Sequence, residues 1–371
     1  YGLALAFGAL LPLSLAPFDY WPLGAVSVAG WFYLLYRSAR RAWLLGWCYG
    51  VGKYAVGASW IYVSIHQYGN ASPPLAVFLV ALFVGGLALF PLLNGWLFHG
   101  CRRGRPLSDA LLFLTLLVGF EWLLTWFLTG FPWLYVGYAH LDTPLGHLAA
   151  LGGVLLVSFA LTLSAVMLVA AALCATRRGR TVAVGLALMP WLAGWLAGQA
   201  VWVESSGRRE VALIQGNVNQ AVKWLPENRM SIYRTYLRLS ETHWDADLLI
   251  WPVAALTFVQ QEAGAALDQL DATAEAAGST LVLGLPAVER IPGGDVVFRN
   301  TAVAVGMGSG RYVKRRLVPF GEYVPLENLL RGLIDFFDLP MSHAEPGDWH
   351  QPLLETGGAR SAMAICYEVV Y

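Results

Sequence analysis

The sequence predicts two unlike parts, a bundle of transmembrane α-helices followed by an α/β domain outside the cytoplasm. Hydrophobic residues make up 57% of the 371 residues and charged residues 13%, against about 45–50% and 25% in soluble domains. Charged residues are sparse up to about Trp202, and short β-rich segments begin near Arg209. The formal net charge is zero, which excludes a protein that binds nucleic acid through bulk positive charge.

Seven apolar runs have about the length that a bilayer span needs, which is roughly 20 residues. They are residues 2–16, 22–36, 43–65, 74–98, 107–128, 146–174 and 181–202. The third to sixth runs are the clearest, whereas the short first pair could instead form a re-entrant hairpin. One amino-terminal signal peptide would explain a single run but not seven. We therefore expect a polytopic membrane domain over residues 1–203.

The short connections between these runs predict the orientation of the chain. Nine Arg residues occur in alternate connections, namely Arg37, Arg40, Arg41, Arg102, Arg103, Arg105, Arg177, Arg178 and Arg180. The intervening connections, 17–21, 66–73 and 129–145, contain no Lys or Arg. Positive charge gathers on the cytoplasmic side of membrane proteins. Residues 204–371 should then lie outside, which predicts a multi-pass protein of the bacterial inner membrane with a periplasmic domain.

Two features of the membrane part invite a functional interpretation. Residues 130–138 form an aromatic, uncharged outer connection, which suits either an interfacial aromatic belt or the lipid-facing lip of an active site. Lys53 lies inside the third run, where a charge in hydrocarbon is costly. It either reaches toward the interface or lines a cavity.

The exported part, residues 204–371, should be a layered α/β domain because strand-like and helix-like segments alternate along it. Strands are expected at residues 211–215, 248–251, 281–283, 301–305, 312–317 and 362–366, and helices at 227–244 and 260–277. The second helix should stop at Gly278, because glycine is common just after a helix end.

Cys366 is the only one of the four cysteines in the exported part. An unpaired thiol is unusual in an oxidising compartment, although a buried, inert cysteine is the plainer interpretation. Cys366 ends the apolar run at 362–366 and precedes Glu368, as when an α/β enzyme presents a nucleophile at a strand end. A reactive thiol needs a nearby base or cation, and Lys314, on the strand expected at 312–317, and Glu322 are candidates.

Three segments occur in the order used by the nitrilase superfamily. They are Ile-Trp-Pro at residues 250–252, the run 314–325, and Ile-Cys-Tyr-Glu at 365–368. Together with the seven apolar runs and Gly-Phe-Pro-Trp at 130–133, they resemble the apolipoprotein N-acyltransferase family over the whole chain.

This resemblance implies an αββα sandwich for the exported domain and a role for each matching residue. Cys366 would be the nucleophile and Lys314 the cation beside the oxyanion, with Glu322 and Glu368 as carboxylates that orient these groups. Further matches to family positions near the pocket are Trp224, Asn300 and Tyr367.

The implied reaction is a two-step acyl transfer. Cys366 would take an acyl chain from a phospholipid, phosphatidylethanolamine in the family, and pass it to the α-amine of a diacylated apolipoprotein. We expect no metal and no cofactor, since the seven His residues show no ligand spacing. A membrane-anchored nitrilase-type amidase and a transporter with an exported binding domain are the alternatives.

The sequence departs from the family pattern in two places. After Trp-Pro the family carries a Glu that acts as general base, and here that position is Val253. Valine accepts no proton, so we expect a folded chain with impaired turnover. We favour a disabled variant over a natural protein with a substitute base such as Glu322. The chain also stops at Tyr371, where we expect the sheet to be incomplete.

Overall fold

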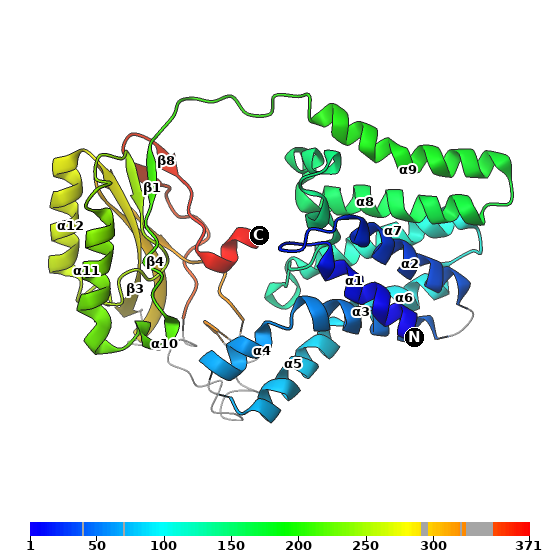
Figure 1. Ribbon diagram of the computed structural model, residues 1–371, viewed down its shortest axis with the longest axis horizontal. Coiled ribbons are helices and arrows are strands. Elements are labelled where there is room, and N and C mark those ends of the chain that lie inside the picture. The colour runs from blue at the N-terminus through cyan, green and yellow to red at the C-terminus, as the bar shows by residue number, and fades with distance from the viewer. Residues whose placement is uncertain (39–40, 70, 291–295, 320, 324–343) are drawn as a thin grey trace. The chain divides into compact units, whose positions relative to one another are not determined.

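A computed structural model describes residues 1–371 except 39–40, 70, 291–295, 320 and 324–343. Contacts divide the chain into two compact units, Tyr1–Glu204 and Ser205–Tyr371, and Figure 1 labels most of their helices and some of their strands. Arg40 of the charged connections and Phe320, Val324 and Pro325 of the family motif lie outside the described residues.

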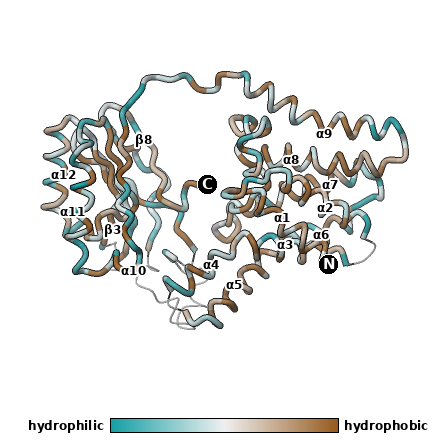
Figure 2. The backbone as a smooth tube through the Cα atoms, viewed as in Figure 1, coloured by the Kyte–Doolittle hydropathy of each residue, from teal (hydrophilic) through white to brown (hydrophobic). Residues whose placement is uncertain are grey.

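The first unit is helical over most of each predicted apolar run. Its α-helices are α1 (Gly2–Leu13), α2 (Pro22–Arg37), α3 (Ala42–Gly57), α4 (Ile61–Val63), α5 (Pro73–Leu87), α6 (Leu89–Cys101), α7 (Pro106–Leu124), α8 (Ala149–Leu173) and α9 (Arg177–Ala197). Short π or 3-10 turns are η1 (Ser64–Tyr68), η2 (Phe127–Thr129), η3 (Val136–His140) and η4 (Pro144–Leu148). Apolar residues dominate these helices (Figure 2). This confirms the predicted helical bundle.

Four helical stretches are long and apolar enough to cross a membrane, judged by length and composition over the described residues. They are Pro73–Cys101, Pro106–Leu124, Pro144–Leu173 and Arg177–Ala197. The helix α1 is shorter, with 12 residues, and α2 and α3 have 16 each. The number of seven spans therefore stays a prediction.

Local sequence explains how these helices begin and pack. Proline stands in the first turn of α2, α5 and α7, where its missing N–H has no intrahelical partner to lose. Gly8 of α1 has no room for a Cβ because the backbone of Tyr49 lies there, and Gly52 of α3 faces the backbone of Leu5 in the same way. Such glycines let membrane helices approach closely.

The second unit contains a five-stranded mixed sheet in the order β1-β2-β3-β4-β6. Its strands are β1 (Val211–Leu213), β2 (Leu248–Ile250), β3 (Thr280–Arg290), β4 (Val296–Gly306) and β6 (Arg311–Val313). A three-stranded sheet joins β5 (Gly308–Ser309), β7 (Leu354–Thr356) and β8 (Arg360–Ser361). The strands β1, β2 and β3 are parallel, whereas β4 is antiparallel to β3 and β6 is antiparallel to β4.

Helices α11 (Arg229–Ser240) and α12 (Gly264–Ala277) lie against one face of this sheet (Figure 1). Their apolar residues share a core with Leu249, Leu281 and Leu283. Val282, which alternates with them along β3, packs instead with Ala304 and Leu354 on the other face. The sheet with its helical layer confirms the predicted α/β domain.

Several predicted boundaries shift, because tertiary contacts override the local pattern. The helices begin at Arg229 and Gly264, later than predicted, and α12 ends at Gly278 as predicted, with φ +71°. The short helices α10 (Gln220–Lys223) and η5 (Pro226–Asn228) precede α11. Lys314 was predicted on a strand, but β6 ends one residue before it.

The predicted strand at residues 362–366 is wrong. β8 ends at Ser361, and a 3-10 helix, η8 (Cys366–Val370), begins at the cysteine itself. Cys366 has φ +54°, a left-handed conformation that no strand residue adopts. The apolar pattern predicts a strand here, but a hydrogen bond from the Ile365 N–H to the Glu368 carboxylate, 2.8 Å long, turns the chain instead.

Candidate active site

Among the described residues of the second unit, Lys314 is the most buried charged side chain, with 1% of its surface exposed. It follows β6 directly, and its backbone N–H donates to the carbonyl oxygen of Asn300 on β4 at 2.8 Å. Its ammonium nitrogen lies 2.7 Å and 2.9 Å from the two carboxylate oxygens of Glu322. The facing carboxylate offsets part of the cost of burying this ammonium.

Glu322 is in turn held by two further donors. The Val318 N–H donates to one carboxylate oxygen at 2.8 Å, and the Asn300 side-chain amide donates to the other at 3.2 Å. Asn300, Lys314 and Glu322 therefore form one network, which fits an orienting role for the last of them. Both oxygens of Glu322 are engaged, so this carboxylate is not free to act as a base.

Glu368 ties the turn at Cys366 to the segment after Lys314. One carboxylate oxygen accepts the Tyr312 hydroxyl at 2.8 Å and the backbone N–H groups of Arg315 and Arg316 at 2.8 Å and 3.0 Å. The other accepts the Ile365 N–H. Burial and this hydrogen bond raise the pKa of Tyr312 to about 12. The carboxylate thus fixes the residue before Cys366 relative to those after Lys314.

Cys366 is exposed at the tip of this turn, which argues against the interpretation of a buried, inert thiol. Its positive φ places a non-glycine residue in a costly conformation, and such conformations cluster at functional sites. Tyr367 follows it and packs edge-on against Tyr371, with ring centroids 5.5 Å apart. The Arg316 guanidinium lies 4.9 Å from the centre of the Tyr371 ring, so one positive charge lies beside the end of the turn.

Val253 lies in the turn that follows β2 and is 38% exposed. Because β2, β3 and β6 run in the same direction, their carboxyl ends meet at one edge of the sheet. Val253, after β2, and Lys314, after β6, therefore lie at that same edge. Gly284 of β3 makes this possible, since a Cβ there would meet the Val253 Cα at 2.7 Å.

Lys223 lies beside Val253 and was not among the predicted site residues. Its amine donates to the carbonyl oxygen of Val253 at 3.3 Å and lies 5.9 Å from the centre of the Trp224 ring. Burial lowers the pKa of Lys223. Trp224, predicted near the pocket, is 38% exposed, and its ring lies beside the Lys223 amine that binds Val253.

A simple signal could have revealed Lys223. The sequence contains only three Lys, at positions 53, 223 and 314, among 24 basic residues. All three are buried. Over the described part of the chain, no cluster of His, Cys, Asp and Glu side chains suits a metal ion.

Comparisons with known proteins agree over both units. Residues 7–167 match the apolipoprotein N-acyltransferase N-terminal domain, and residues 210–371 match the carbon-nitrogen hydrolase domain. Proteins named apolipoprotein N-acyltransferase from Pseudomonas aeruginosa and Azotobacter vinelandii are 47% identical, each over 100% of this chain and 73% of their own length. The protein of that name from Vibrio cholerae is 38% identical over 100% of this chain and 74% of its own. The chain belongs to the apolipoprotein N-acyltransferase family.

Proposed function

We propose that this chain is a membrane-bound N-acyltransferase that acts on apolipoproteins through a thioester on Cys366. The acyl donor is a phospholipid, phosphatidylethanolamine, and the acceptor is the α-amine of an amino-terminal diacylglyceryl-cysteine. The observation that carries the proposal is the buried Lys314–Glu322 pair, at the sheet edge that also bears Val253, in a chain of this family. Neither the amidase nor the transporter is favoured by the family match.

The first half-reaction moves the acyl chain to the enzyme. The Cys366 thiolate attacks the ester carbonyl, and the Lys314 ammonium stabilises the negative charge that develops on the carbonyl oxygen. The bond to the glycerol oxygen breaks, and this oxygen leaves as lysophospholipid. It takes the proton that the general base, the family's Glu at position 253, removed from the thiol. In the second half-reaction the acceptor amine attacks the thioester and gives its proton to the base. An amide forms, and the thiolate is released.

Val253 removes the group that should move these protons. The position lies at the correct sheet edge, but valine has no atom that accepts a proton. Glu322 is a poor substitute, because its two oxygens hold Lys314, Val318 and Asn300. This supports a disabled variant with an otherwise intact site, in which loss of the base costs about 10²–10⁴ in rate.

The chain is a membrane protein, and we place it in the bacterial inner membrane with residues 204–371 in the periplasm. The nine Arg residues in alternate connections support this orientation. Both substrates carry acyl chains, so a site at the outer headgroup level would let them remain in the bilayer during the reaction.

The function is tested by restoring the base. Purified Val253→Glu protein, incubated with phosphatidylethanolamine and a diacylated lipopeptide, should form N-acylated peptide at least about 10²-fold faster than the unchanged chain. Mass spectrometry of the peptide measures the product. Failure of the Val253→Glu protein to acylate the peptide, with hydrolysis of a small amide in its place, would overturn the proposal in favour of the amidase.

A further inference from the structure

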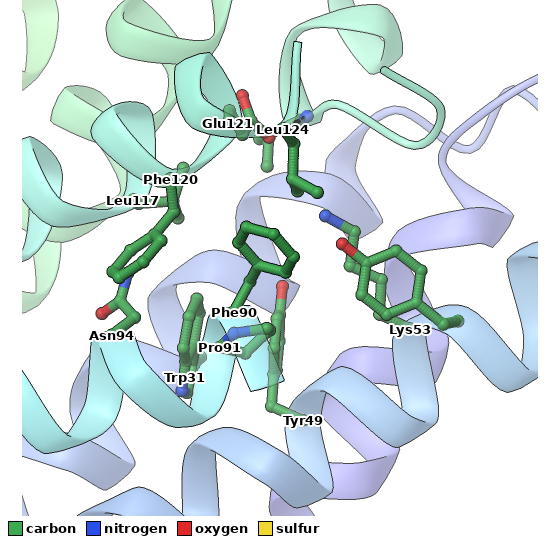
Figure 3. A pocket seen from close by; sticks show the side chains of 12 residues that line it. Trp31, Tyr49, Lys53, Phe90, Pro91, Asn94, Leu117, Phe120, Glu121 and Leu124 are labelled. Carbon is green, nitrogen blue, oxygen red and sulfur yellow. Dashed lines mark hydrogen bonds between the residues drawn. The ribbon is translucent and has the colours of Figure 1, made fainter. Parts of the chain in front are cut away.

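Two opposite charges are buried in the helical unit, apart from the site described above. Lys53 of α3 is 6% exposed and Glu121 of α7 is 3% exposed. Both line a cavity of about 30 Å³ together with Tyr49 and Asn94. Figure 3 shows Lys53 and Tyr49 reaching toward this space from α3, and Glu121 from α7. Ionised groups inside a membrane bundle are costly and rarely without purpose.

The charges of this pair do not touch each other. No carboxylate of the described residues lies within 4.0 Å of the Lys53 ammonium, whose nearest ring contact is Tyr54 at 5.3 Å. One oxygen of Glu121 accepts the Val136 N–H at 2.8 Å. The other makes no well-formed hydrogen bond to a described residue, although the Ser158 hydroxyl interacts with this carboxylate.

The size and polarity of the cavity suit water. The centre of a water-sized sphere has about 30 Å³ of room there, more than the roughly 10–15 Å³ that one water needs, and buried waters typically make two to four hydrogen bonds. The cavity offers the Lys53 ammonium as donor and the second Glu121 oxygen as acceptor. The buried Asn94 side-chain oxygen, also without a partner among the described residues, is a third polar group on its wall.

We propose that a buried water molecule bridges Lys53 and Glu121, so that the two form an indirect ion pair inside the bundle. This pair fixes the Glu121 carboxylate, which in turn holds the Val136 N–H. The same outer segment, residues 130–138, is also held at Gly137, whose N–H donates to the Ser158 hydroxyl at 2.9 Å. The bridged pair therefore anchors the aromatic outer segment to the helices beneath it.

A double-mutant cycle tests the coupling between the two charges. Lys53→Met and Glu121→Gln each leave one buried charge unbalanced, and each should lower the melting temperature in detergent by roughly 5 °C or more. The double variant should recover at least half of the summed loss. If the melting-temperature loss of the double variant equals the sum of the two single losses, the two charges are not coupled and the proposed pair is wrong.

Asp109 supplies the matched control. It is a second buried carboxylate on α7, and one of its oxygens also accepts a backbone N–H, that of Arg103 at 2.8 Å. It does not line the cavity, so Asp109→Asn combined with Lys53→Met should give additive losses. Hydrogen exchange of a peptide covering residues 131–140 should become faster in Glu121→Gln and stay unchanged in Asp109→Asn.

The water itself is tested on the unchanged protein. A high-resolution density map in lipid nanodiscs should show one peak within hydrogen-bond distance of both the Lys53 ammonium and the Glu121 carboxylate. An empty cavity, or a direct contact between these two groups, would overturn the bridge. None of these measurements needs catalytic activity, so the result does not depend on the proposed function.

Discussion

Replacing Glu368 by Gln tests how the cysteine turn is held. One Glu368 oxygen accepts three hydrogen bonds and the other accepts the Ile365 N–H. A glutamine that keeps the first three must point its NH2 group at the Ile365 N–H, so the fourth bond is lost. A hydrogen bond to a charged group contributes about 1.5–3 kcal/mol. The three hydrogen bonds that remain are also weakened, because their acceptor is then a neutral amide oxygen.

The loss should fall on the geometry of Cys366 more than on global stability, because a surface turn can loosen without unfolding the sheet. A misplacement of about 1 Å costs on the order of 10²-fold in rate. The rate of acyl-enzyme formation, measured in the Val253→Glu background, should therefore fall by about this factor. The melting temperature should change by only a few degrees.

Glu289→Gln is the matched control for this experiment. Glu289 of β3 pairs with Arg299 of β4 and Arg311 of β6, and these ion pairs do not involve the Cys366 turn. It should lower stability and leave the acylation rate unchanged. A Glu368→Gln protein whose acylation rate stays within threefold of its parent would refute the proposed role of this carboxylate.

Three other predictions concern the remaining charges and the topology. Lys314→Ala in the Val253→Glu background should slow acyl-enzyme formation by about 10²–10³; a change below threefold would contradict its role. Folding lowers the pKa of Lys223 from 10.5, so the free energy of unfolding should rise as the pH increases toward about 10.5. The Lys223→Met protein should lack this rise and should be more stable than its parent at neutral pH. A Cys placed at Ser206, but not one at Ser38, should react with an impermeant thiol reagent added outside; the reverse would invert the orientation.

The sequence predicts the helices and most strands correctly because their apolar patterns are long and are satisfied locally. It does not predict the turn at Cys366, since the residues 362–366 look like a strand and only the Glu368 carboxylate bends them. It misses Lys223 for a similar reason. The importance of that side chain comes from its contact with the carbonyl oxygen of Val253, 30 positions away in the chain.

The sequence likewise predicts only part of the network around Lys314. The motif allows Lys314 and Glu322 to be chosen as candidates, but their direct pairing at 2.7 Å appears only once β4 and β6 are folded side by side. The same holds for the shared sheet edge of Val253 and Lys314, which depends on strand order. Strand order is set by packing between distant segments, which no local pattern records.

The central claim is that Cys366 carries the acyl chain, and intact-mass measurement tests it most directly. After incubation with phosphatidylethanolamine, Val253→Glu protein should gain the mass of one acyl chain, and hydroxylamine should remove it. The Val253→Glu/Cys366→Ala protein should gain nothing. A hydroxylamine-labile acyl adduct on that double variant would contradict the account, because the nucleophile would then be a residue other than Cys366.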